Sequence, residues 1–317
     1  MNSAELFEDV VHLPDPKGQA DYERLVGLDE YKERLVKETL LLVDPELLRN
    51  WNKEHHRGEL VALDHFAARP SLFVLAGDVG TGKTALARSF GNEVAKRARV
   101  QVHLYALSLS ARGSGAVGEM TRLISSAFQQ VRDAVSKSRG IDGRSGRGII
   151  LLIDEADALA QSREAAQMHH EDRAGVNALI RGVDDTAAER LPIAIIMCTN
   201  RLDALDPAVR RRAAAVFEFR RPTRAQRIHV LRESLRGSDI TEPELESLGE
   251  ATGEMPGHQY GFTYSDLTQR LVPSIVLDAF PDRPLAGARA IEIARRMRPT
   301  PPFRENGHVR SLGGSNV

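Results

Sequence analysis

The sequence has few of the features that mark secreted and membrane proteins. Its 317 residues include one cysteine, Cys198, so no disulfide can form within the chain. No stretch approaches the roughly 18 consecutive apolar residues that a membrane-spanning helix needs. The first residues are acidic and do not have the basic start and apolar core of a secretory signal. We therefore expect a reduced, cytoplasmic protein that does not associate with a membrane.

An excess of charge of one sign is also missing. The chain has 43 Lys+Arg against 44 Asp+Glu, which leaves a formal net charge of −1. Proteins that bind nucleic acid without specificity normally have a net basic field, so this balance argues against that class and leaves open only a local basic groove. The composition, 42% hydrophobic and 27% charged, is that of a globular protein. At roughly 150 residues per domain, the length predicts about two domains.

The hydrophobic pattern predicts an α/β fold followed by a helical domain. Four apolar runs look like buried parallel strands, at residues 72–76, 100–107, 149–153 and 193–197, and a short strand is expected over 215–219. After Pro222 the spacing is helical, over residues 225–235, 242–252, 264–279 and 285–297. The predicted organisation is a flexible arm over residues 1–20, an α/β domain over 21–221, a helical domain over 222–297 and a disordered tail over 298–317.

A phosphate-binding motif follows the first predicted strand and opens a helix. The match to G-x-x-x-x-G-K-[ST] consists of Gly77, Asp78, Val79, Gly80, Thr81, Gly82, Lys83 and Thr84. The glycines let backbone N–H groups turn inward around phosphates. Lys83 is expected to reach the β- and γ-phosphates, and the Thr84 hydroxyl to bind Mg²⁺. The motif therefore predicts a site for a nucleoside triphosphate with Mg²⁺.

Two carboxylates end the third predicted strand. Asp154 and Glu155 are delivered to the carboxyl edge of the sheet, where open α/β sheets bind their substrates. Asp154 is expected to hold the Mg²⁺ shell, and Glu155 to act as general base on the attacking water. Residues 154–157 also spell the D-E-A-D box of one helicase group. The sequence contains no Ser-Ala-Thr motif and no second phosphate-loop domain after residue 222, which argues against a helicase.

Asn200 and a group of arginines extend this pattern. Asn200 follows the fourth strand and is expected to hydrogen-bond the γ-phosphate or the attacking water, with a turn cap as the alternative. Further on, Arg210, Arg211 and Arg212 are consecutive. We interpret them as arginines supplied to the γ-phosphate of a neighbouring subunit, and the alternative is a basic surface.

In this order and spacing, the motifs resemble an AAA+ ATPase module over about residues 21–297. Residues 23–29, E-R-L-V-G-L-D, are similar to the linker before the module, and residues 261–267, G-F-T-Y-S-D-L, are similar to the start of a lid helix. Tyr264 and Ser265 occupy the positions where other AAA+ proteins have a second sensor arginine, so no residue of this chain is assigned as a second sensor. The resemblance implies an Mg²⁺-dependent ATP hydrolase that works as a homo-oligomeric, hexameric ring.

Within AAA+ proteins, residues 173–184 resemble the V-N-A-x-L-x-x-I-D helix of the pachytene-checkpoint ATPases, which remodel HORMA-domain proteins. The arginine finger of that branch aligns with Arg212, and that of the wider group aligns with Arg211. About 20 residues precede the module, as in the bacterial relatives that accompany antiphage CBASS systems. The resemblance therefore implies a HORMA-like protein partner and the restraint of a defence signal.

Two other functions remain as alternatives. An AAA+ loader could use the basic segment 136–148 to contact nucleic acid. A protease-coupled unfoldase would need a strong pore grip, but Ala116 stands where threading relatives carry an aromatic residue, and the chain has no peptidase motif. Weak gripping suits the extraction of a short N-terminal segment, unless Arg112 or His169 contacts the substrate.

Overall fold

The chain forms two compact units, Met1–Pro222 and Thr223–Val317. The computed structural model describes residues 6–67, 69–109, 118–138, 147–159, 169–203, 205–256 and 259–303. The first unit is built on a six-stranded sheet, whose strands are β1 (Asp9–Leu13), β2 (Leu72–Gly77), β3 (Gln101–Ser108), β4 (Arg147–Asp154), β5 (Ile193–Thr199) and β6 (Ala213–Phe219). The predicted α/β fold is confirmed.

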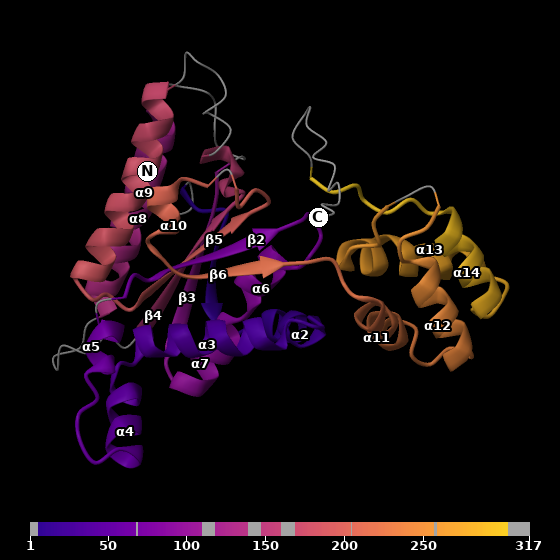
Figure 1. Cartoon of the computed structure of the whole chain (residues 1–317), viewed down its shortest axis with the longest axis horizontal. Helices are drawn as coiled ribbons and strands as arrows, with labels where there is room; N and C mark the ends of the chain where they lie inside the picture. Colours follow the sequence, from indigo (N-terminus) through magenta and orange to yellow (C-terminus); the bar gives the residue numbers. More distant parts are fainter. Residues whose placement is uncertain are drawn as a thin grey trace, which may run out of the picture. The chain divides into compact units, whose positions relative to one another are not determined.

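The order of the strands in the sheet is β1-β3-β4-β5-β2-β6, and β2 to β6 run parallel to one another (Figure 1). β2 and β5 are apolar almost throughout, because a central parallel strand is covered on both faces. Parallel strands end at the same edge of a sheet. The carboxyl ends of β2, β4 and β5 therefore lie side by side, and this edge carries the candidate site.

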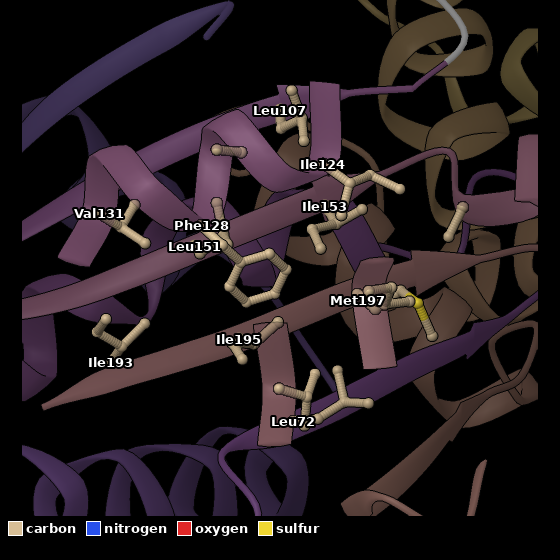
Figure 2. Close-up of a cluster of buried hydrophobic side chains, with 14 of the residues drawn as sticks. Leu72, Leu107, Ile124, Phe128, Val131, Leu151, Ile153, Ile193, Ile195 and Met197 are labelled. Atoms are coloured by element: carbon tan, nitrogen blue, oxygen red, sulfur yellow. The ribbon is translucent and has the colours of Figure 1, made fainter. Parts of the chain in front are cut away.

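Helices cover both faces of the sheet (Figure 1). Those of the first unit are α2 (Pro16–Arg24), α3 (Asp29–Val43), α4 (Glu46–His55), α5 (Ala62–Ala67), α6 (Lys83–Ser89), α7 (Gly91–Ala98), α8 (Glu119–Ser138), η1 (Ala156–Leu159), α9 (His169–Ala188) and α10 (Pro207–Arg210). On one face, Figure 2 shows Phe128 of α8 beside Leu151 and Ile195 of the sheet. On the other face, Leu35 of α3 and Leu86 of α6 belong to a second buried cluster.

The predicted flexible arm over residues 1–20 is wrong for the described residues 6–20. Leu6 and Phe7 are buried in the core, and β1 pairs antiparallel with β3 along its whole length. Pro16 lies in the first turn of α2, where its missing N–H has no cost. The strand was missed because an edge strand depends on its partner, which lies some 90 residues later, for both hydrogen bonds and burial.

The second unit is helical, with α11 (Arg224–Ser234), α12 (Glu242–Ala251), η3 (Asp266–Leu271), α13 (Val272–Ala279) and α14 (Gly287–Arg296). Its first helix begins with a capping box between Thr223 and Gln226. None of the helices in the described ranges is long and apolar enough to cross a membrane.

Two details of the second unit differ from the sequence prediction. The helix expected over 264–279 contains the π-helical segment η3, which ends two residues before Pro273. The ring and missing N–H of this proline do not fit a regular α-helical turn. Residues 298–303, expected to be part of a disordered tail, are tied to the helices. Thr300 donates from its N and Oγ1 to the carboxylate of the buried Asp266, at 3.0 and 2.6 Å.

Candidate active site

The phosphate-binding motif forms the connection between β2 and α6. Gly77 has φ +148°, and a Cβ there would lie 2.1 Å from the backbone oxygen of Phe219, so no side chain fits. Gly82, at the start of α6, has φ +97°, in the left-handed region that favours glycine. The two glycines let the loop between them curl tightly, which is the backbone arrangement that a phosphate group requires.

Lys83 is the first residue of α6, and its side chain reaches back to the loop and is 7% exposed. Its Nζ donates to the backbone oxygens of Gly77 and Asp78, at 2.9 and 2.8 Å, and to Oδ1 of Asn200 at 2.9 Å. Burial lowers the pKa of Lys83, and nearby carboxylates oppose that shift. The ammonium group is thus held against the backbone of the loop, beside the strand-end Asn200.

Thr84 and Asp154 meet where α6 begins and β4 ends. The Thr84 Oγ1 donates to Asp154 Oδ1 at 3.2 Å, and the backbone N–H of Glu155 donates to the same oxygen at 2.9 Å. Burial raises the pKa of Asp154, and these two hydrogen bonds oppose the increase. A hydroxyl oxygen beside a carboxylate is a donor set that fits Mg²⁺, which prefers oxygen ligands. The two residues therefore fit the ion that the motif implies.

Glu155 is exposed and adopts an unusual backbone conformation, with φ +53°. A non-glycine residue in this region costs of order 1 kcal/mol and is typical of functional sites. The Ser108 hydroxyl at the end of β3 donates to Glu155 Oε2 at 2.8 Å. This hydrogen bond orients a carboxylate at the sheet edge, next to the Mg²⁺ donor set, as a general base requires.

Asp157 organises the opposite side of the site, and the sequence analysis missed this role. It is 8% exposed and accepts hydrogen bonds from Thr199 Oγ1 at 2.5 Å, from Asn200 N and Nδ2 at 2.9 and 2.8 Å, and from Arg201 N at 3.1 Å. With Nδ2 bound to Asp157, Oδ1 of Asn200 faces the Lys83 ammonium. The only sequence signal for Asp157 is its place in the D-E-A-D box of residues 154–157, which was weighed above as a helicase motif.

The arginines lie in and after the short helix α10. The Asp206 side chain caps this helix by accepting from the N–H of Ala208 at 2.7 Å. Arg211 is exposed, whereas Arg212 donates through Nε and Nη2 to the two carboxylate oxygens of Asp184 on α9, at 2.7 and 2.9 Å. Lys83, Thr84, Asp154, Glu155 and Asn200 come together at the sheet edge, whereas Arg212 is bound to Asp184 on α9 and Arg211 is exposed.

Comparison with known proteins identifies the family. Residues 73–221 match the model of the ATPase family associated with various cellular activities (AAA). The chain is 50% identical over 299 residues to CD-NTase-associated protein 6 of Escherichia coli strain MS 115-1, and the alignment covers 94% of this chain and 96% of the relative. The chain belongs to the AAA family of ATPases.

Solved structures agree with the assignment of this chain to the AAA family. A chain of the HORMA:CdnC:Trip13 complex of E. coli MS115-1 superposes with a TM-score of 0.88 at 49% identity, covering 96% of this chain and 99% of that one. Trip13 from Rhizobiales superposes with a TM-score of 0.72 at 45% identity, covering 93% and 100%. The predicted membership of the HORMA-remodelling, pachytene-checkpoint-like branch of AAA+ proteins is confirmed. The protein is an ATP hydrolase.

Several sequence predictions about the AAA ATPase fall outside the described residues. Ala116 and Arg112, considered for the first pore loop, lie in the undescribed range 110–117, and most of the basic segment 136–148 lies in the range 139–146. The side chain of His169 is likewise outside what the structure describes. The grip on a substrate therefore remains a prediction from sequence.

Proposed function

We propose that this AAA ATPase binds Mg²⁺–ATP at the loop Gly77–Thr84 and hydrolyses it to remodel a HORMA-like protein. The observation that carries the proposal is the end-to-end similarity, at 49% identity, to a chain that was solved in a complex with HORMA and CdnC. In the bacterial cytoplasm, disassembly of such a partner would restrain a CBASS antiphage signal.

The chemical roles follow from the contacts at the sheet edge. Lys83 would give up its backbone partners to bind the β- and γ-phosphates, while Thr84 and Asp154 would hold Mg²⁺. When bound, the ion would neutralise charge on the phosphate oxygens. Glu155, oriented by Ser108, would accept a proton from the attacking water, and Asn200 would hold that water or the γ-phosphate.

A neighbouring subunit would complete each site. Arg212, with Arg211 as the second candidate, would approach the γ-phosphate across a subunit boundary and neutralise charge that develops during transfer. Among the described contacts, Arg212 binds Asp184 on α9 and no residue of the loop of its own chain, which supports this arrangement. It requires a head-to-tail contact between subunits. By the family resemblance, we propose that these contacts build a hexameric ring.

Affinity capture from the native cells tests the proposal. The Glu155→Gln protein, loaded with ATP, should retain its substrate because the hydrolysis needed for release is blocked. Lys83→Ala, which should not bind ATP, is the matched control. Recovery of a HORMA-like protein with Glu155→Gln and not with Lys83→Ala is the expected result. Recovery of nuclease-sensitive nucleic acid with replication or repair proteins would instead favour the loader and overturn HORMA remodelling.

A further inference from the structure

The loop Gly77–Thr84 contains a carboxylate, that of Asp78, which is paired with Arg221 near the C-terminal end of the first unit. Arg221 donates from Nε and Nη2 to Oδ2 of Asp78, at 2.8 and 2.6 Å, across 143 residues of sequence. The side chains are 15% and 18% exposed, so both charges are largely shielded from water. Partial burial makes this ion pair stronger than a pair on the open surface.

The register of the sheet places these two residues together. β2 and β6 run parallel, with Gly77 opposite Phe219, and these residues approach so closely that a Cβ on Gly77 would meet the backbone oxygen of Phe219. Asp78 follows Gly77, and Arg221 follows Phe219 by two residues. The pair is therefore fixed by the backbone and does not depend on the chance meeting of two long surface side chains.

A carboxylate at this position is an electrostatic problem for a nucleotide site. The backbone oxygen of Asp78 accepts a hydrogen bond from Lys83 Nζ, so its carboxylate belongs to a residue in direct contact with the phosphate-binding lysine. An Asp78 carboxylate that swung toward the loop would compete with phosphate for this ammonium and would repel a polyanionic ligand. Near a protein surface, where the effective dielectric constant is about 20, an uncompensated unit charge close to a bound anion is enough to change its affinity about tenfold.

We propose that Arg221 is a positioning residue for ATP binding, which neutralises the Asp78 carboxylate and, together with the Val79 N–H that donates to Oδ1 of Asp78 at 2.9 Å, fixes its position. The inference rests on the proposed nucleotide site at Gly77–Thr84. Arg221 acts through Asp78 and has no direct role in hydrolysis. Its removal should therefore weaken the binding of ATP and leave the rate at saturating ATP within about twofold. Removal of the Asp78 charge should cancel the effect.

Equilibrium titration with a fluorescent ATP analogue, together with steady-state ATPase kinetics, tests this inference in the full chain. Arg221→Ala should raise Kd and KM about tenfold, and Asp78→Asn in the same chain should restore both to within about threefold of their original values. Arg221→Lys should recover part of the affinity because it keeps the charge. Arg220→Ala, which removes the exposed neighbouring arginine, is the matched control and should bind as the wild type does.

Two results would overturn the inference: normal affinity in Arg221→Ala, or weak affinity that Asp78→Asn does not restore. If circular dichroism shows that Arg221→Ala does not fold, the ATP affinities of Asp78→Asn and Asp78→Asn/Arg221→Ala are compared instead. A difference above about threefold between these two variants would contradict the inference. Lys83→Ala separates the two proposals. Loss of binding in Lys83→Ala supports the nucleotide site whatever Arg221 does, whereas normal binding there would remove the basis for both.

Discussion

Arg212 binds Asp184 of the same chain through two hydrogen bonds, at 2.7 and 2.9 Å, although we propose that it acts on a neighbouring subunit. The Arg212 and Asp184 side chains are 33% and 50% exposed, so the ion pair is at the surface, where water and salt screen it and its contribution to stability is small. Its opening is therefore a small cost compared with the stabilisation of a γ-phosphate. Asp184 is also the final residue of the V-N-A-x-L-x-x-I-D match in α9, so this sequence motif and the arginine meet in the fold.

Arg212→Ala should lower kcat by at least about 100-fold, because one guanidinium that neutralises transition-state charge is worth about 10³–10⁵ in related phosphoryl transfers. Mixing Arg212→Ala with Glu155→Gln subunits should restore part of the hydrolysis, since each variant supplies what the other lacks. As the control, Arg212→Ala subunits are mixed with the double variant Glu155→Gln/Arg212→Ala. This mixture should restore no hydrolysis, because no subunit supplies the arginine. Absence of recovery in the first mixture would place the arginine outside the neighbour's site.

Glu155→Gln should keep ATP affinity within a few fold and reduce kcat by about 10²–10⁴-fold, because the amide cannot accept the proton of the attacking water. Ser108→Ala should have a smaller effect, of about two- to tenfold, because it removes only the hydrogen bond that orients Glu155. Single-turnover hydrolysis with pre-bound ATP measures both rates. Normal turnover by Glu155→Gln would show that another group is the base.

Asp157→Ala should both destabilise the protein and slow hydrolysis. Its carboxylate accepts from the hydroxyl of Thr199, the N–H and side-chain amide of Asn200, and the N–H of Arg201. Loss of these buried partners should cost about 2–4 kcal/mol and release the Asn200 amide from its orientation toward Lys83. Urea unfolding and kcat should both change. The exposed Asp203, changed to Ala, is the control and should affect neither.

Gly77→Ala should lower the free energy of unfolding by at least about 3 kcal/mol, since the new Cβ would lie 2.1 Å from the Phe219 oxygen and φ is +148°. Gly58→Ala is a matched control, because no atom lies within 4 Å of its added Cβ. That change should stay within about 0.5 kcal/mol. Equal stabilities of the two variants by urea unfolding would contradict the close contact between β2 and β6.

Acid should destabilise the sheet through His103 of β3, which is 5% exposed and stacks on His12 of β1 with ring centroids 4.1 Å apart. Burial, with smaller contributions from His12 and Arg147, lowers the pKa of His103 from 6.5 to about 4. The native state favours the neutral ring, so its contribution to stability is full above pH 6.5 and is lost as the pH falls toward 4.

Between about pH 7 and about pH 5, this loss amounts to about 2 kcal/mol. His103→Phe removes the titrating group and keeps the buried ring, so its free energy of unfolding should fall less over the same range. Urea unfolding of both proteins at the two pH values measures the difference. Equal pH dependence would show that other groups govern the acid sensitivity.

The sequence by itself determined the elements whose signal is local. The buried strands were visible as apolar runs because a covered parallel strand is apolar throughout, and the phosphate-binding loop was visible because its glycines, Lys83 and Thr84 are adjacent in the chain. The acid pair Asp154–Glu155 and the strand-end Asn200 were found by the same logic, since the end of a buried strand predicts a place at the sheet edge.

The tertiary structure alone decided the pairings between distant segments. β1 is a strand because it pairs with β3 and exchanges backbone hydrogen bonds with it. Asp157 is oriented toward Asn200 by the packing of η1 against β5, and Arg221 reaches Asp78 because β6 lies beside β2. Periodicity and propensity describe neighbours within a few residues, whereas a hydrogen bond or ion pair between segments 43 or 143 residues apart depends on which strands the whole chain places side by side.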